Sequence, residues 1–313
     1  MKLLSYRRGN VRSIGVLLGK KVLDLKESIN NNIGGTFLDL PKDSVTDMID
    51  FLTFGDYTLR ETQKLIKWIS TLDKSGMTNV PIFDLNYIDF EAPIPNLRKN
   101  IVCLGLTYAD HVAEGKQTLE KEQQLPSYPI FFTKSPTSIN SPFGNIVYSR
   151  FTKRLDYEVE LAVIIGKEGK NIPKEKVFDY IVGYSVFNDI SARDLQTQHG
   201  QWFKGKSLDT FAPMGPYIVT SEEIEDPMNL DLWLKVNGII RQRSNTSKMI
   251  FDIPTIISVL SEGITLEVGD IIATGTPSGV GSAHKLGMLQ IGDVVEAHIS
   301  NIGTLRNRVI SDL

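Results

Sequence analysis

The stretch from Arg154 to Ile165 reads RLDYEVELAVII, and the interpretation of the whole chain starts from it. Alternate side chains of a β-strand point to the same face, so Glu158 and Glu160 share a face, with Asp156 just before them. From Leu161 onward both faces are apolar, which predicts a strand buried on both sides. Two adjacent buried carboxylates repel each other, so one takes up a proton or a cation lies between them. The alternative is an edge strand with a solvated acidic face.

A third carboxylate, Asp189, ends a second apolar strand in the sequence VFNDISARD. Together with Glu158 and Glu160 it would form an all-oxygen metal site. Such a site favours Mg²⁺ or Mn²⁺, with Ca²⁺ as a structural substitute, over zinc or copper. The alternative is that Asp189 is the N-cap of a helix over the residues SARDLQ, and one side chain can do both.

Two further motifs carry side chains of acid–base chemistry. His111 and Glu114 lie three apart in ADHVAEG, a predicted short helix that ends at Gly115, so they share one helical face. Such a pair can hold a water and take its proton, although a solvated surface pair has the same spacing. The segment GQWFKGKS at 200–207 matches a phosphate-loop pattern, but neither a buried strand before it nor a helix after it is predicted. Lys206 is then a cation for an anionic substrate or an exposed loop lysine.

Composition narrows the class of protein. The chain has 313 residues, of which 41% are hydrophobic and 23% are charged, as in ordinary globular proteins. A net charge of -3 and a pI near 5.9 give no electrostatic case for nucleic acid or an anionic membrane as a partner. No apolar run approaches the ~20 residues of a membrane span. Without a signal-peptide core and with Cys103 as the single cysteine, we expect a cytoplasmic protein.

The order of patterns along the chain predicts two unequal domains. Short apolar runs broken by Gly-containing turns predict strands up to about residue 40, and two amphipathic segments up to residue 72 predict helices. A proline-containing connector over 74–98 places the boundary, giving a small N-terminal domain at 1–95 and a main domain at 96–313. The main domain is strand-rich without long βα alternation, and LDLWLKVNGIIRQ predicts a hairpin around Asn237-Gly238. This pattern favours an α+β fold around a strongly bent sheet.

Seven segments of the main domain, in this order, resemble the fumarylacetoacetate hydrolase family. They are NIVCLGLTYADHVAEG, PIFFTKSPTS, DYEVELAVIIGK, GYSVFNDISARDLQ, KGKSLDTFAPMGP, LWLKVNGIIRQ and GDIIATGTPSGVG. The resemblance covers nearly everything from about residue 100 onward. It implies a mixed β-roll catalytic fold, with a small β-rich N-terminal domain as many bacterial members carry. It also implies a homodimer and a site for Mg²⁺ or Mn²⁺.

The resemblance also assigns roles to residues. Metal ligands fall on Glu158, Glu160 and Asp189. The catalytic positions fall on His111 and Glu114 in a lid, and on Lys206. Positions that hold the substrate carboxylate fall on Arg193, Gln196 and Thr276.

The implied reaction is the metal-dependent hydrolysis of a C–C bond in an acylpyruvate. A 2,4-dioxo acid such as fumarylpyruvate or acetylpyruvate would give pyruvate and a carboxylic acid. The alternative is an oxaloacetate decarboxylase or an isomerase of an unsaturated 2-oxo or 2-hydroxy dicarboxylic acid in aromatic catabolism, which needs no water nucleophile. Lys116 and Lys121 in the segment after Glu114 could attract a second carboxylate of such a substrate.

Overall fold

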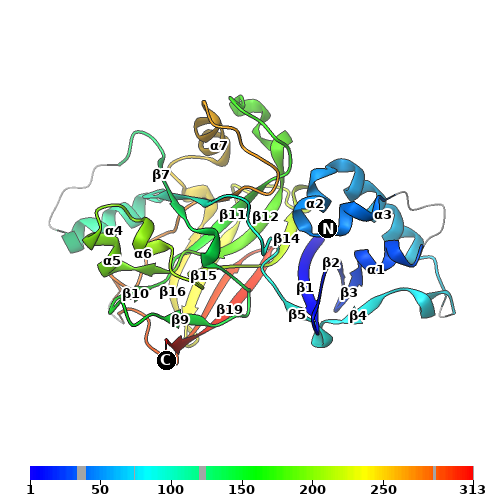
Figure 1. Cartoon of the computed structure of the whole chain (residues 1–313). Helices are drawn as coiled ribbons and strands as arrows, with labels where there is room; N and C mark the ends of the chain where they lie inside the picture. The colour runs from blue at the N-terminus through cyan, green and yellow to red at the C-terminus, as the bar shows by residue number, and fades with distance from the viewer. Residues whose placement is uncertain (34–39, 74, 120–124, 285–286, 313) are drawn as a thin grey trace.

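The computed structural model describes residues 1–33, 40–73, 75–119, 125–284 and 287–312, and within 115–119 it describes the backbone alone (Figure 1). The strands are β1 (Lys2–Arg8), β2 (Val11–Leu18), β3 (Lys21–Asp24), β4 (Ile82–Asp84), β5 (Asp89–Phe90), β6 (Ile101–Gly105), β7 (Ile130–Lys134), β8 (Ile139–Asn140), β9 (Ile146–Tyr148), β10 (Leu155–Asp156), β11 (Val159–Ile165), β12 (Ile181–Asn188), β13 (Ser191–Ala192), β14 (Ala212–Thr220), β15 (Asp231–Val236), β16 (Ile239–Asn245), β17 (Ile271–Ala273), β18 (Val294–Ile299) and β19 (Gly303–Ser311). The α-helices are α1 (Leu25–Asn30), α2 (Met48–Thr53), α3 (Asp56–Ile69), α4 (Ala109–Leu119), α5 (Arg193–Gln198), α6 (Phe203–Lys206) and α7 (Ile253–Ser261). The 3₁₀ helices are η2 (Lys42–Val45), η3 (Gly76–Asn79), η4 (Leu85–Tyr87), η5 (Pro136–Ser138), η6 (Lys174–Tyr180), η7 (Ser221–Glu223) and η8 (Thr246–Lys248).

One large mixed sheet carries most of the fold. Its strands run in the order β4-β3-β2-β1-β14-β12-β11-β17-β6-β7, and β11 lies in its interior between β12 and β17. A second sheet has the order β16-β15-β18-β19-β9, and β10 pairs with β13. The predicted α+β fold is therefore confirmed. The interior position of β11 shows that its acidic residues do not belong to a solvated edge strand.

The two faces of β11 pack into two different apolar cores. Leu161, Val163 and Ile165 belong to the larger core, which also takes in the second sheet and α7. Ala162 and Ile164 belong to the other core, which includes the N-terminal strands and α2. All seven residues of the strand are buried, as the apolar run predicted. Burial on both sides holds the strand in place and fixes where its first residues project.

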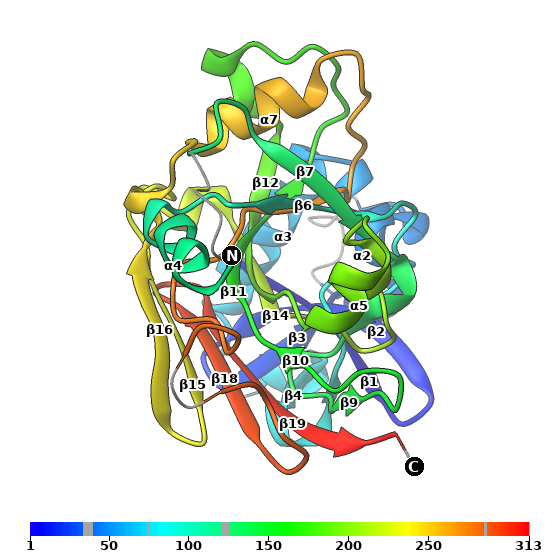
Figure 2. The same ribbon diagram turned by 90° about the vertical axis from the view of Figure 1, so that its left-hand side faces the viewer.

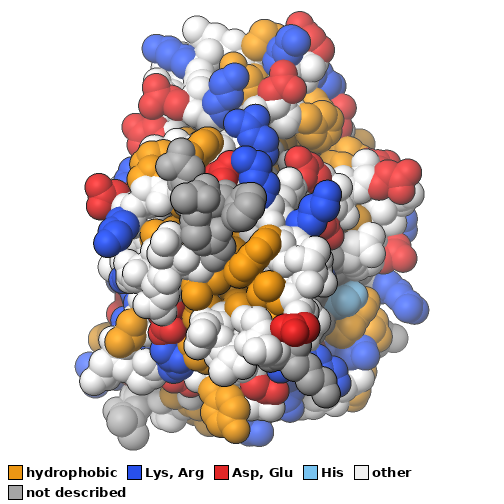
Figure 3. All heavy atoms as spheres, turned by 90° about the vertical axis from the view of Figure 1, so that its right-hand side faces the viewer, with side chains coloured by type: hydrophobic (Ala, Val, Ile, Leu, Met, Phe, Trp, Pro, Cys, Tyr) orange, Lys and Arg blue, Asp and Glu red, His pale blue; other side chains and the backbone are white. Residues whose placement is uncertain are grey.

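The N-terminal strands continue the sheet of the main domain. β1 pairs with β14 through Leu3 and Ile218, so the large sheet crosses the boundary predicted at residue 95. Helices α1, α2 and α3 gather beside these strands, to the right in Figure 1. Figure 3 views that side and shows Lys, Arg, Asp and Glu side chains intermixed around an apolar patch near its centre.

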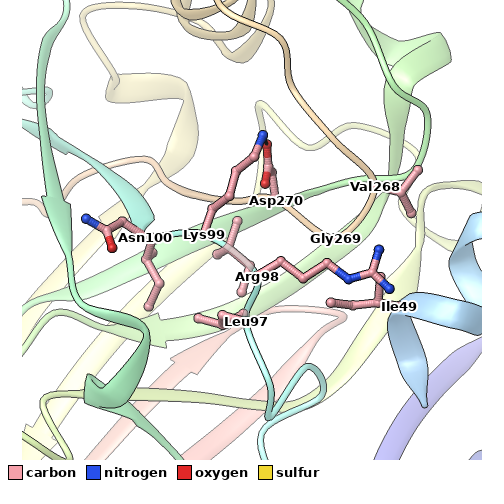
Figure 4. Close-up of a pocket in the computed structure, with 10 residues that line it drawn as sticks. Ile49, Leu97, Arg98, Lys99, Asn100, Val268, Gly269 and Asp270 are labelled. Carbon is pink, nitrogen blue, oxygen red and sulfur yellow. Dashed lines mark hydrogen bonds and ion pairs between the residues drawn. The ribbon is translucent and has the colours of Figure 1, made fainter. Parts of the chain in front are cut away.

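Ion pairs hold the connector against both parts of the chain. Arg98 lies 3.4 Å from Asp50 of α2, and Lys99 lies 3.3 Å from Asp270 just before β17. Figure 4 shows Lys99 and Asp270 pointing toward each other beside Arg98 and Ile49. The connector is thus attached to the helix of one part and to the central sheet of the other.

Local predictions from the sequence were mostly confirmed. The Asn237-Gly238 turn joins β15 to β16 with φ values of +52° and +79°, as a two-residue hairpin requires. The helix predicted to end at Gly115 instead runs on to Leu119, so that boundary was wrong. Figure 2 shows α4 and α5 over one side of the molecule and α7 at one end. Among the described residues, no helix combines the length and apolar character needed to cross a bilayer.

Candidate functional site

Three buried carboxylates converge at the start of β11 and the end of β12. Glu158 precedes β11, Glu160 lies within it, and Asp189 follows β12 directly. The antiparallel register pairs Val159 with Asn188, which brings these strand ends together. Their exposed fractions are 5%, 1% and 0%. Each residue offers an oxygen that lies within 4.8 Å of those of the other two.

Basic side chains surround two of the three carboxylates. Lys206 Nζ donates to Glu158 Oε2 at 2.7 Å and to Asp189 Oδ2 at 2.6 Å. Arg193 donates to the other oxygen of Glu158 at 2.6 Å and to Asp156 at 2.8 Å. Burial alone would raise the pKa of Glu158, but the nearby Arg193 and Lys206 outweigh it and hold that pKa well below its usual range.

Glu160 is the carboxylate that lacks such compensation. Its one hydrogen-bond donor among the described residues is the Gly275 N–H, at 2.8 Å. Burial, followed by the charges of Asp189 and Glu158, raises the pKa of Glu160 well above its usual range. An uncompensated buried carboxylate beside two others is the donor set that a hard divalent cation with oxygen ligands requires. The residues present therefore fit the predicted metal site.

The helix N-cap alternative for Asp189 was wrong. Helix α5 begins at Arg193, and its N-cap is Ala192, which makes no side-chain cap. Both oxygens of Asp189 instead accept from lysines, Oδ1 from Lys134 and Oδ2 from Lys206. The proposed phosphate loop was rightly rejected, because Lys206 lies at the end of the four-residue helix α6 and points into the acidic cluster. For the same reason it is not an exposed loop lysine.

His111 and Glu114 lie together on α4, as their spacing predicted. His111 Nδ1 is 3.4 Å from Glu114 Oε2. The Gly279 N–H donates to both oxygens of Glu114, at 2.9 and 3.0 Å. Their side chains are 17% and 19% exposed, so the pair is sheltered and not a solvated surface pair. This arrangement orients the imidazole and leaves it within reach of the cavity described next.

The predicted site residues meet in one cavity of about 410 Å³, a size typical of small-molecule sites. The predicted residues that line it are His111, Glu114, Glu158, Glu160, Arg193, Gln196, Lys206 and Thr276. Asp189 is the ninth predicted residue; it lies behind this wall and reaches the site through Lys206. Aromatic and apolar side chains, Phe132 and Trp202 among them, form another part of the wall.

Protein partners occupy the side chains predicted to hold a substrate carboxylate. Arg193 donates to Gln196 Oε1 at 3.2 Å in addition to its two carboxylates. The Thr276 hydroxyl donates to the Val159 carbonyl at 3.0 Å and accepts from Gln242 at 2.8 Å. Their contact with a substrate stays a prediction, and for Thr276 it requires the hydroxyl to turn away from Val159.

Sequence analysis missed two residues that shape the site. Lys134 at the end of β7 is fully buried and donates to Asp189 and, at 3.0 Å, to the Ile190 carbonyl. Burial lowers the pKa of Lys134, although Asp189 opposes that effect. Gln242 on β16 accepts from the Val159 N–H at 3.0 Å and donates to Thr276 and Pro277 at 2.8 Å. A lysine closing an otherwise apolar strand (PIFFTK) was the available signal for Lys134; strand alternation put Gln242 inside, without indicating its partners.

The fold and this cavity define a class of protein, and the comparisons agree with it. Residues 100–310 match the family model described as fumarylacetoacetate (FAA) hydrolase C-terminal. Because this is more than half of the chain, the protein belongs to the fumarylacetoacetate hydrolase family, an enzyme family with hydrolase and isomerase members.

Three proteins illustrate what the chain is similar to. The oxaloacetate tautomerase YisK of Bacillus subtilis is 44% identical over 266 residues, which cover 84% of this chain and 86% of that protein. The mitochondrial oxaloacetate tautomerase Fahd2a of Rattus norvegicus is 37% identical over 291 residues, with coverages of 90% and 86%. Maleylpyruvate hydrolase from Sphingobium sp. SYK-6, solved with manganese (II) and pyruvate, superposes with a TM-score of 0.74 at 27% identity, covering all of both chains.

Proposed function

We propose that the protein is a divalent-metal-dependent tautomerase that interconverts the enol and keto forms of oxaloacetate. The observation that carries this proposal is the meeting, in one cavity, of a buried all-carboxylate cation site and a sheltered His–Glu pair. The likeness to oxaloacetate tautomerases from two distant organisms supports this reaction among those the site could carry out. It lies closer to the alternative of the sequence analysis, an oxaloacetate decarboxylase or an isomerase of an unsaturated dicarboxylic acid, than to acylpyruvate hydrolysis.

The cation would be held by Glu158, Glu160 and Asp189. When bound there, Mg²⁺ or Mn²⁺ would polarise the 2-oxo group of the substrate and stabilise negative charge on its oxygen. In this structure Lys206 bridges Glu158 and Asp189, so it stays beside the cation and adds positive charge to the same region.

The remaining residues of the site would move and direct the proton. In the keto-to-enol direction a proton leaves C3 and a proton arrives at the 2-oxo oxygen, and the reverse reaction returns both. The imidazole of His111 takes the proton at C3, and Glu114 stabilises the imidazolium that forms. The two hydrogen bonds from Gly279 hold Glu114 in the position this requires. Solvent water that enters the cavity supplies the proton that arrives at the 2-oxo oxygen.

Hydrolysis of a C–C bond is the second candidate. The structural likeness to a maleylpyruvate hydrolase with bound pyruvate supports it, and the same His–Glu pair could activate a water. A homodimer, which the sequence resemblance implied, is proposed for either reaction.

The test follows the ultraviolet band of enol-oxaloacetate after dilution into buffer, with Mn²⁺ and then with EDTA. Pyruvate release from oxaloacetate is measured in the same samples, and loss of acetylpyruvate and fumarylpyruvate in parallel ones. We expect Mn²⁺-dependent loss of the enol band that outpaces pyruvate release. Activity on the acylpyruvates without acceleration of the enol band would contradict the proposal and favour hydrolysis.

Glu114→Gln separates the two reactions in a single variant. An amide oxygen can still accept from Gly279, but the charge that supports a proton-abstracting imidazole is lost. We expect tautomerisation to fall by less than about 10-fold, whereas general-base activation of water would fall by about 10²- to 10⁴-fold. A loss of about 10²- to 10⁴-fold in the tautomerase assay as well would show that Glu114 itself carries the proton.

A further inference from the structure

Among the described residues that line the cavity, one cation has no carboxylate partner. Arg193 is held by Asp156 and Glu158, and Lys206 by Glu158 and Asp189. Arg154 also lines the cavity, and its guanidinium has no carboxylate partner among the described residues. An arginine left free at the wall of an otherwise neutralised site is available to an anion from outside.

The backbone fixes Arg154 at the open side of the cavity. Its carbonyl accepts from the Arg193 N–H at 3.0 Å, which anchors residue 154 beside the start of α5. Residue 154 is exposed, whereas Glu158 and Glu160 are buried. The cavity therefore has a deep end at the carboxylates and an outer end at Arg154.

We propose that Arg154 binds the second carboxylate of the substrate and makes the site selective for dicarboxylic 2-oxo acids. This inference rests on the proposed function, because it assumes that the 2-oxo acid end of the substrate lies at Glu158, Glu160 and Asp189. The far carboxylate of a four-carbon diacid then lies toward the outer end, where a planar guanidinium can donate two parallel hydrogen bonds to it. A monocarboxylic 2-oxo acid offers nothing for Arg154 to bind.

The sequence had suggested Lys116 and Lys121 for this carboxylate. Lys121 and the side chain of Lys116 lie outside the described residues. Sequence analysis did not single out Arg154, although it precedes Asp156, Glu158 and Glu160 at intervals of two.

The experiment compares two ligands that differ by one group. 3,3-Dimethyloxaloacetate and trimethylpyruvate have the same skeleton, with a carboxylate in one where the other has a methyl group. Neither has a hydrogen at C3, so calorimetry on the Mn²⁺-loaded protein reports binding without tautomerisation. Carbon dioxide release is monitored in the same samples, because 3,3-dimethyloxaloacetate is a β-keto acid and can decarboxylate.

Three variants isolate Arg154. In R154M we expect binding of the diacid to weaken by about 10- to 100-fold, the usual value of a charge-assisted pair, with trimethylpyruvate changed less than twofold. R154K keeps the positive charge but lacks the paired N–H donors of a guanidinium. Its affinity for the diacid should lie between those of R154M and the unmodified protein. K153M is the matched control, because Lys153 is exposed, adjacent, of equal charge and not part of the cavity wall.

The outcomes separate this inference from the proposed function. Equal weakening of both ligands in R154M, an equal effect of K153M, or no preference for the diacid in the unmodified protein would overturn the assignment of Arg154. A selective effect of R154M in a protein that does not accelerate enol-oxaloacetate would retain Arg154 and reject the tautomerase. If the protein is a tautomerase and R154M leaves its KM for oxaloacetate unchanged, the proposed function stands and the assignment of Arg154 is rejected.

Discussion

Glu160 is the buried carboxylate of the site that has no cationic hydrogen-bond partner among the described residues. It is 1% exposed, neighbours two other carboxylates, and receives one backbone N–H from within the described chain. Its raised pKa means that the metal-free protein favours the protonated form of this side chain. A bound divalent cation would replace that proton, so binding of metal and loss of the proton are coupled.

Glu160→Gln should therefore remove most of the stabilisation against unfolding that added Mn²⁺ provides. The unmodified protein should gain about 2.7 kcal/mol of unfolding free energy at a Mn²⁺ concentration 100 times Kd. The E160Q variant should lose most of that gain, and without metal it should be no less stable, because an amide is neutral. Thermal unfolding with and without Mn²⁺ measures both. Glu168→Gln, at an exposed position outside the site, should respond to Mn²⁺ as the unmodified protein does.

Gly279 is the residue whose lack of a side chain positions the His–Glu pair. It has φ of +101°, and a Cβ would lie 2.0 Å from the Arg241 carbonyl oxygen. Gly279→Ala must shift the loop that donates to Glu114, so tautomerase activity should fall severalfold, by no more than the roughly 10-fold limit expected for Glu114→Gln. Gly292→Ala is matched, with φ of +98° and nothing within 4 Å of its Cβ, so it should lose only some stability to strain. Equal activities of the two variants would dissociate Gly279 from catalysis.

At the scale of elements, Gln242 ties three segments together. It joins β16 to the start of β11 and to the loop that carries Thr276 and Pro277. That loop also supplies the Gly275 N–H to Glu160, so the same side chain connects the second sheet with β11. Packing alone would hold these elements together without fixing their register at the site.

Gln242→Leu should lower stability by about 2–4 kcal/mol, because it leaves the buried Val159 N–H and Pro277 carbonyl without partners. Urea unfolding measures the change. Gln63→Leu is the control, since Gln63 makes one exposed hydrogen bond, to Glu222, and should change stability by less than about 0.5 kcal/mol. If Q242L loses no more unfolding free energy than Q63L, the hydrogen bonds of Gln242 do not stabilise the fold.

At the scale of the whole molecule, Glu91 links the connector to the N-terminal hairpin. Burial would raise its pKa, but Arg12 and Arg7 outweigh it and lower that pKa. The folded state therefore binds fewer protons than the unfolded state, whose glutamate has a pKa of about 4.3. The stability from Glu91 is complete above that value and is lost as the pH falls through the folded pKa.

The urea midpoint of Glu91→Gln should accordingly lie below that of the unmodified protein at pH near 7, and the gap should close toward pH near 3. Glu175→Gln, at an exposed position, should show no such gap at either pH. A gap for E91Q that stays constant over the whole range would assign the effect to packing.

Much of this molecule could be predicted from its sequence, for identifiable reasons. Period-two alternation placed Glu158 and Glu160 together, and the apolar run behind them predicted an interior strand. Helical spacing placed His111 beside Glu114. The joining of β1 to β14 could not be predicted, because strand pairs distant along the chain leave no local periodic signal. Lys134 was missed because a single lysine at a strand end usually lies in solvent, and only the tertiary fold brings Asp189 to it.

Lys206 also bears on the order of events during biosynthesis. Its ammonium group donates to both Glu158 and Asp189 inside the folded chain, and its single positive charge offsets part of their negative charge. The chain therefore holds these two carboxylates together through its own lysine, and its folding would not depend on the proposed cation. The proposed cation would then enter through the cavity after folding. Metal supply would then set the fraction of active molecules without setting the amount of folded protein.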